Sequence, residues 1–79
     1  MQYFVRSIEK HMDSDKVFGP ELRCTGLDMA KTVAKRIVLA ADPAIRMQAD
    51  ACIRNRGQVL TKYRCWVNER GDFLENVLG

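Results

Sequence analysis

The chain has 79 residues, of which 47% are hydrophobic, 13 are lysine or arginine and 10 are aspartate or glutamate, so the net charge is +3. This length allows one compact domain and leaves no room for a second. The hydrophobic content excludes a disordered chain, and the mild positive charge permits an anionic partner without requiring one. We therefore expect a single small domain over residues 1–79.

The cysteines and the apolar runs indicate where such a protein works. The chain has three cysteines, Cys24, Cys52 and Cys65, and no two of them form a C-x-x-C pair. A secreted disulfide scaffold usually has an even and denser set of cysteines. The longest apolar run, residues 37–41, is far shorter than the roughly 20 residues that span a bilayer, and the first residues carry no signal-peptide pattern. We expect a soluble protein in the cytoplasm, which is the host cytoplasm if a phage encodes it.

The first elements in chain order are two strands. Residues 2–8 are rich in aromatic and β-branched types, which favour a strand. A polar loop follows, and residues 17–24 form a second, weaker strand. Pro20 lacks a backbone donor, so this second strand suits the edge of a sheet or a bulge.

A helix is predicted after Thr25-Gly26. Asp28 is a good N-cap, because its carboxylate can accept from the first free amides. The apolar positions then recur at helical spacing, and Asp42-Pro43 ends the helix because the residue before a proline avoids the α region. This stripe consists of Ala30, Val33, Ala34, Ile37, Val38 and Ala41.

Residues 43–56 allow two interpretations. Pro43 at a first helical position and Gly57 as a terminator would frame a second helix. Against this, Met47, Ala49, Ala51 and Ile53 alternate with polar residues, which is the period of a strand. We predict a strand over about 47–54, followed by a hairpin turn at Gly57, and keep the second helix as the alternative.

Residues 58–67 are the clearest strand, and residues 73–78 make a final strand after a glycine turn. Simple alternation places Val59, Thr61, Tyr63, Cys65 and Val67 on one face, and Leu60, Lys62, Arg64 and Trp66 on the other. The predicted order is β-β-α-β-β-β. The fold class is α+β, with two layers in which a single helix packs on an antiparallel sheet.

The sequence offers no recognisable catalytic set. The one histidine is His11, in a polar loop, and the close pair Asp13 and Asp15 is explained by a solvated turn. The three cysteines would have to converge with His11 from four segments to make a zinc site, so we expect no metal. No phosphate-cradling glycine loop is present. We therefore expect a protein that is not an enzyme and that needs no cofactor.

Basic residues around one hairpin are the strongest functional signal. If the strands hold, Lys62, Arg64 and Trp66 point the same way and Arg54 lies on the neighbouring strand. Guanidinium and ammonium groups pair with phosphates or carboxylates, and an exposed tryptophan adds stacking or an interface anchor. The alternative is a solvated face on which Trp66 lies across Leu60 or the Phe4/Ile8 side of the first strand. A second basic surface lies on the helix. The candidate partner-binding residues are Arg54, Arg56, Lys62, Arg64, Trp66, Lys31, Lys35 and Arg36.

The layout resembles the small phage-encoded anti-CRISPR proteins that disable type I (Cascade) surveillance complexes. The resemblance rests on "LDMAKTVAKRI" at 27–37 and on the glycine-turned meander "IRNRGQVLTKYRCWVNERGDF" at 53–73. It implies a stoichiometric inhibitor that binds a protein–RNA surface where target DNA would dock. The positive charge departs from the acidic DNA mimics of this family, and no family motif maps onto single positions.

Two functions follow from the sequence. The first is an inhibitor or interaction protein, expected as a monomer, that binds a type I CRISPR complex and blocks target DNA recognition. The alternative is a small basic nucleic-acid-binding accessory or regulatory protein that uses the same residues on phosphate. In both cases we expect that the double substitution Lys62→Glu and Arg64→Glu abolishes partner binding and leaves thermal stability nearly unchanged.

Overall fold

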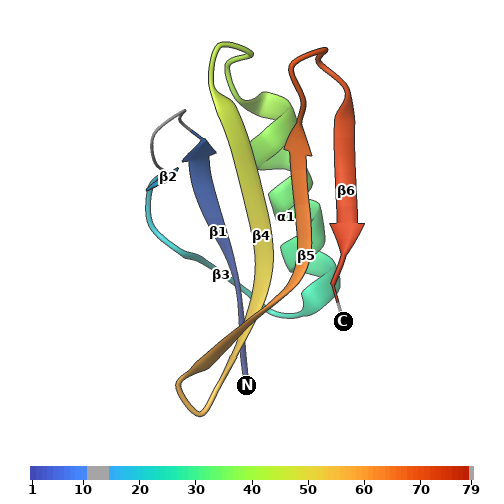
Figure 1. Cartoon of the computed structure of the whole chain (residues 1–79). Coiled ribbons are helices and arrows are strands. Elements are labelled where there is room, and N and C mark those ends of the chain that lie inside the picture. Colours follow the sequence, from blue (N-terminus) through green and yellow to red (C-terminus); the bar gives the residue numbers. More distant parts are fainter. Residues whose placement is uncertain (11–14, 79) are drawn as a thin grey trace.

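A computed structural model describes residues 1–10 and 15–78. The elements in chain order are β1 (Gln2–Lys10), β2 (Asp15–Val17), β3 (Leu22–Cys24), α1 (Leu27–Ala40), β4 (Arg46–Asn55), β5 (Gln58–Val67) and β6 (Phe73–Val77). The strands form one antiparallel sheet in the order β2-β1-β4-β5-β6, and β3 also pairs with β1. The helix lies against one face of this sheet (Figure 1). The predicted α+β, two-layer architecture is therefore confirmed.

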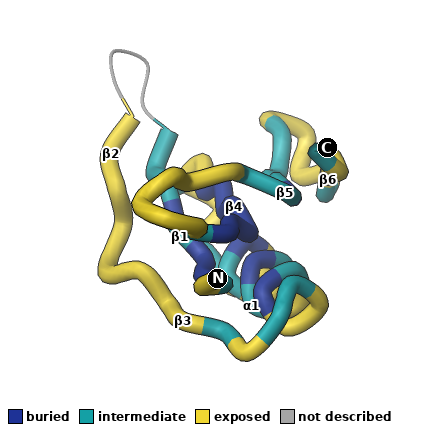
Figure 2. The backbone as a smooth tube through the Cα atoms, turned by 90° about the horizontal axis from the view of Figure 1, so that it is seen from below, coloured by how far each residue is buried: buried dark blue, intermediate teal, exposed yellow. Residues whose placement is uncertain are grey.

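The core lies between α1 and the centre of the sheet. Ala30, Ala34 and Val38 are the buried residues of the helix, and they contact a sheet floor that includes Ala49 and Ala51. Small side chains on both layers let the two backbones approach closely. Figure 2 shows buried residues along β1, β4 and the inner side of α1, and exposed residues on β2 and on the β4–β5 hairpin.

Residues 46–55 form strand β4, so the strand interpretation is confirmed and the alternative helix is wrong. Its alternating side chains pair along their whole length with β1, from Gln2 opposite Arg54 to Lys10 opposite Arg46. The β4–β5 turn has two central residues, Arg56 and Gly57, with φ of 54° and 80°. Positive φ at both positions is the geometry of a type I′ turn, whose twist matches that of the flanking strands.

Two local predictions are wrong. The segment 17–24 is not one strand, because Gly19 takes a φ of 73° and Pro20 lacks a backbone donor, so pairing with β1 is interrupted between β2 and β3. Asp28 is not the N-cap, because the helix begins at Leu27, with Gly26 as N-cap. Gly26 supplies no side-chain cap, and Asp28 instead lies in the first turn, where its negative charge suits the helix dipole.

The predicted alternation of side chains along β5 holds from Tyr63 onward but is wrong for the residues before Lys62. Ala51 pairs with Tyr63, but the next β4 residue, Cys52, pairs with Thr61, so Lys62 has no partner on β4. This is a β-bulge, and it moves Thr61 to the face opposite Tyr63. The Thr61 hydroxyl lies 3.7 Å from the Cys52 sulfur, which confirms that these two side chains share a face.

Candidate functional site: the outer face of the sheet

The face of the sheet turned away from α1 is the candidate functional site, and we call it the outer face. In the described part of the chain, α1 is the one element outside the sheet, so no second layer covers this face. The strand register places its side chains in cross-strand rows. One row is Ile8, Gln48, Trp66 and Leu74, and the next is Arg6, Asp50, Arg64 and Asn76.

A buried carboxylate lies at the centre of the outer face. The Asp50 side chain is 0% exposed, although it lies on the face turned away from α1. Arg64 donates to both of its oxygens, from Nε to Oδ1 at 3.0 Å and from Nη2 to Oδ2 at 3.1 Å. Gln48 Nε2 donates to Oδ1 at 3.1 Å. Such bidentate, charge-assisted bonds fix the guanidinium plane and its position.

Arg6 approaches Asp50 from the other side. Its Nη2 lies 3.8 Å from Asp50 Oδ2, and its Nε is buried without a hydrogen-bond partner in the described part of the chain. Two guanidinium groups thus flank one carboxylate, which leaves this cluster with a net positive charge. The side chains of Arg6 and Arg64 are 34% and 40% exposed, so both reach solvent. The hydrogen bonds with Asp50 raise the pKa of Arg64, which keeps its charge fixed.

Trp66 lies beside this cluster. It follows Arg64 by two residues on the same strand, so the two side chains share the outer face. Gln48 is opposite on one side and Leu74 on the other, and the indole is half-buried. Trp66 is thus far from Leu60, which pairs with Ile53 beyond the bulge.

Arg54 belongs to the outer face but is held by other groups. Its guanidinium lies 4.6 Å from the centre of the Phe4 ring and donates to both oxygens of Glu21, at 3.0 and 3.2 Å. This stacking covers Phe4, which is buried, and ties β4 to the segment before β3. The guanidinium of Arg54 is therefore engaged in contacts within the protein and is less available to a partner than those of Arg6 and Arg64.

The remaining predicted residues lie elsewhere. Arg56 is at the exposed tip of the hairpin and Lys62 is at the bulge, and neither forms an ion pair with any residue that the structure describes. On the helix layer, Lys31 and Lys35 lie 6.0 and 5.7 Å from the centre of the Tyr63 ring, and Lys35 also pairs with Glu75 at 3.9 Å. Arg36 is exposed on the same helix. The structure therefore separates the basic helix patch from the outer face.

Sequence reasoning missed Arg6, Gln48 and Asp50. One signal was available, because Asp50 is the single acid between residues 46 and 66 and falls in the middle of a strand. A carboxylate in that position requires a cationic partner on a neighbouring strand. The identity of that partner depends on the strand register, which the sequence does not state.

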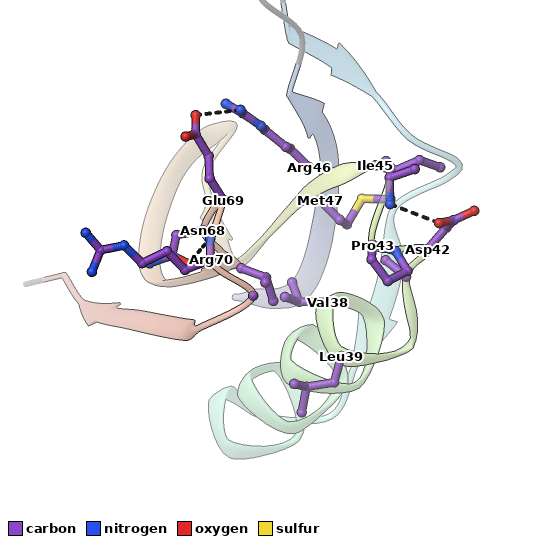
Figure 3. A pocket seen from close by; sticks show the side chains of 14 residues that line it. Val38, Leu39, Asp42, Pro43, Ile45, Arg46, Met47, Asn68, Glu69 and Arg70 are labelled. Atoms are coloured by element: carbon purple, nitrogen blue, oxygen red, sulfur yellow. Dashed lines mark hydrogen bonds and ion pairs between the residues drawn. The ribbon is translucent and has the colours of Figure 1, made fainter.

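A hollow lies at one end of the molecule, away from the outer face. It has a volume of about 660 Å³ and lies between the C-terminal end of α1, the α1–β4 loop and the β5–β6 turn. Figure 3 shows Val38 and Leu39 on its helical side, and Arg46 and Glu69 meeting across its rim in an ion pair of 2.6 Å. Its size suits a small ligand, but no nucleophile with an adjacent base lines it.

Other chemistry is limited in the described residues. No group of three or more metal-ligating side chains gathers within residues 1–10 and 15–78. His11 and Asp13 lie outside the described residues. Burial raises the pKa of the Cys52 thiol and raises that of Cys65 to about 11, which makes both thiols poor nucleophiles. Over the same residues, no helix has the length and apolar character needed to cross a membrane.

Comparison with known proteins gives no match, either to a family model, to a curated protein or to a solved structure. The outer face and its chemistry are therefore the features of this chain that point to a function.

Proposed function

We propose that the protein is a non-catalytic binding protein that acts by covering a partner's surface with the outer face of its sheet. The observation that carries this proposal is the Arg6–Asp50–Arg64 cluster beside Trp66, on a sheet face that no second layer covers among the described residues. Guanidinium groups with a half-buried indole are typical of binding surfaces, where arginine and tryptophan contribute most of the affinity. The cationic character favours an anionic partner.

The partner to test first is a type I CRISPR surveillance complex. The layout of helix and meander resembles anti-CRISPR proteins, and a surveillance complex is a nucleoprotein whose bound RNA offers phosphates to a cationic face. A protein that occupies this surface would block target DNA without any chemical step. The proposal thus places the protein in a bacterial cytoplasm, as an inhibitor that binds stoichiometrically.

A pull-down with the tagged full chain tests this function. A purified type I complex is expected to be retained by the intact chain and lost with Trp66→Ala, because truncation removes the half-buried indole from the interface. Leu39→Ala is the matched control, since Leu39 is 64% exposed on the helix layer. Retention that is equal for both variants, or no retention by the intact chain, would contradict the proposal.

A further inference from the structure

Asp50 contacts two guanidinium groups and leaves both with donors to spare. A guanidinium has five N–H groups, and Arg64 uses those of Nε and one of Nη2 on the carboxylate. Arg6 makes a single contact of 3.8 Å with Asp50, through Nη2, and its side chain is 34% exposed, so part of its guanidinium can reach a ligand. Its Nε has no partner in the described part of the chain, but it is buried and is not an available donor. The cluster is therefore under-satisfied on its cationic side.

The unused N–H donors of Arg6 and Arg64 suit a tetrahedral oxyanion such as phosphate, which has several acceptor oxygens. Arg64 is fixed by its two hydrogen bonds with Asp50, and Arg6 lies 3.8 Å from the same carboxylate, so an incoming phosphate meets two guanidinium groups that are already close to one point. Because Asp50 is fully buried and both arginines are partly exposed, the net charge faces solvent. An anion with several acceptor oxygens could thus bridge Arg6 and Arg64.

Trp66 indicates which phosphate-bearing ligand fits. Its indole is half-buried in the row next to Arg64, with the apolar side chains of Ile8 and Leu74 in the same row. A base that stacks on an aromatic ring must be free of its own neighbours, as it is in a single strand. A duplex would offer phosphates to the arginines but would keep its bases away from the indole.

We propose that the outer face binds single-stranded nucleic acid, with one phosphate bridged by Arg6 and Arg64 and one base stacked on Trp66. Asp50 is a positioning residue, because it contacts both guanidinium groups without touching the ligand. The proposal rests on the proposed function in that both use the same face, and it names the chemical class that this face recognises.

Trp66 is the one tryptophan of the chain, so its fluorescence reports directly on stacking. The full chain is titrated with a short oligothymidylate, and we expect saturable quenching that weakens with salt, by a log–log slope of about −0.7 for each phosphate contact. A DNA duplex of equal length is expected to quench less. Inorganic phosphate is expected to weaken oligothymidylate binding without quenching by itself. The absence of quenching by oligothymidylate, or equal quenching by the duplex, would overturn the proposal.

Arg64→Lys distinguishes a phosphate site that depends on guanidinium geometry from attraction by positive charge alone. The substitution keeps the charge and removes the planar, forked arrangement of donors. We expect oligothymidylate affinity to fall about tenfold, since one ammonium cannot serve both Asp50 and a phosphate in this geometry. Arg70→Lys, on the exposed β5–β6 turn, is the control and should leave affinity unchanged. Arg6→Lys tests the same point from β1 if Arg64→Lys does not fold. Affinities equal to that of the intact chain would overturn the site.

The outcomes for the partner and for the single strand are separable. Retention of a type I complex without oligothymidylate binding would leave the proposed function standing and overturn the nucleic-acid inference. Oligothymidylate binding that depends on Arg64 and quenches Trp66, without retention of that complex, would support the inference and contradict the proposed partner.

Discussion

Arg64 on β5 holds the fully buried carboxylate of Asp50 on β4 through two hydrogen bonds of 3.0 and 3.1 Å. The pair lies on the sheet face that no helix covers in the described part of the chain, and Arg6, Gln48 and Arg64 contact Asp50 there. Arg64 therefore has two roles, since it neutralises a buried charge and presents the rest of its guanidinium to solvent. The proposed binding would therefore be coupled to stability at this residue.

Arg64→Gln is expected to lower the free energy of unfolding by about 3 kcal/mol, because it leaves Asp50 buried with weaker compensation. Arg46→Gln is the matched control. Its pair with Glu69 is shorter, at 2.6 Å, but both side chains are well exposed, so we expect a change below about 0.5 kcal/mol. Urea unfolding of both variants measures the difference. Equal losses would show that Asp50 does not depend on Arg64.

This coupling changes the expectation for charge reversal. Arg64→Glu would place a second carboxylate beside Asp50, so the double variant with Lys62→Glu should lose stability as well as binding. Lys62→Glu alone should leave the melting temperature within a few degrees, because Lys62 forms no ion pair with a described residue. Thermal unfolding of the single and double variants separates the two effects.

The fold could be predicted because periodicity and turn chemistry are local. The alternation from Met47 to Ile53 identified β4, and the glycine at 57 identified the hairpin. The Arg6–Asp50–Arg64 cluster could not be predicted, because it joins three strands through their register. The bulge at Lys62 was missed for a related reason, since one extra residue in β5 shows itself only against the partner strand.

Alkaline pH is expected to destabilise the protein through Cys65. Burial raises the pKa of this thiol from its ordinary value near 9 to about 11. A raised pKa in the folded state means that the stabilisation is complete below pH 9 and is lost as the pH rises to about 11. We expect a loss on the order of 1–2 kcal/mol across this range.

Cys65→Ala is the variant that tests this cause. Urea unfolding at intervals from pH 8 to pH 11 should show a shallower decline for Cys65→Ala than for the intact chain. Burial also raises the pKa of Tyr63, so part of the decline should remain in the variant. A decline of unchanged size would mean that the Cys65 thiol does not contribute.

Gly26→Ser is expected to stabilise the helix. Gly26 is the N-cap of α1, has an extended backbone with φ of −169° and offers no side-chain acceptor to the first amides. A Cβ atom added at this position meets no atom within 4 Å, so a serine can be placed here, and its hydroxyl can then cap the helix. The gain should be a few tenths of a kcal/mol, measured by thermal unfolding. Asp28→Asn, which keeps the shape of the first turn, should lose a similar amount through the helix dipole.

Arg56→Asn is expected to raise stability while lowering any affinity that depends on the hairpin tip. Arg56 has a φ of 54°, in the left-handed region that asparagine tolerates better than arginine, and Asn-Gly is the preferred pair in a type I′ turn. The gain should be about 0.5 kcal/mol. Gly57→Ala is the opposite control. Gly57 has a φ of 80°, and an added Cβ atom would meet no other atom within 4 Å. The variant should therefore lose about 1 kcal/mol in the free energy of unfolding through backbone conformation alone. If Arg56→Asn stabilises the chain and also weakens oligothymidylate binding, the strained arginine is kept for its charge. If binding is unchanged, the tip lies outside the contact surface, and the Arg6–Asp50–Arg64 cluster with Trp66 accounts for recognition on its own.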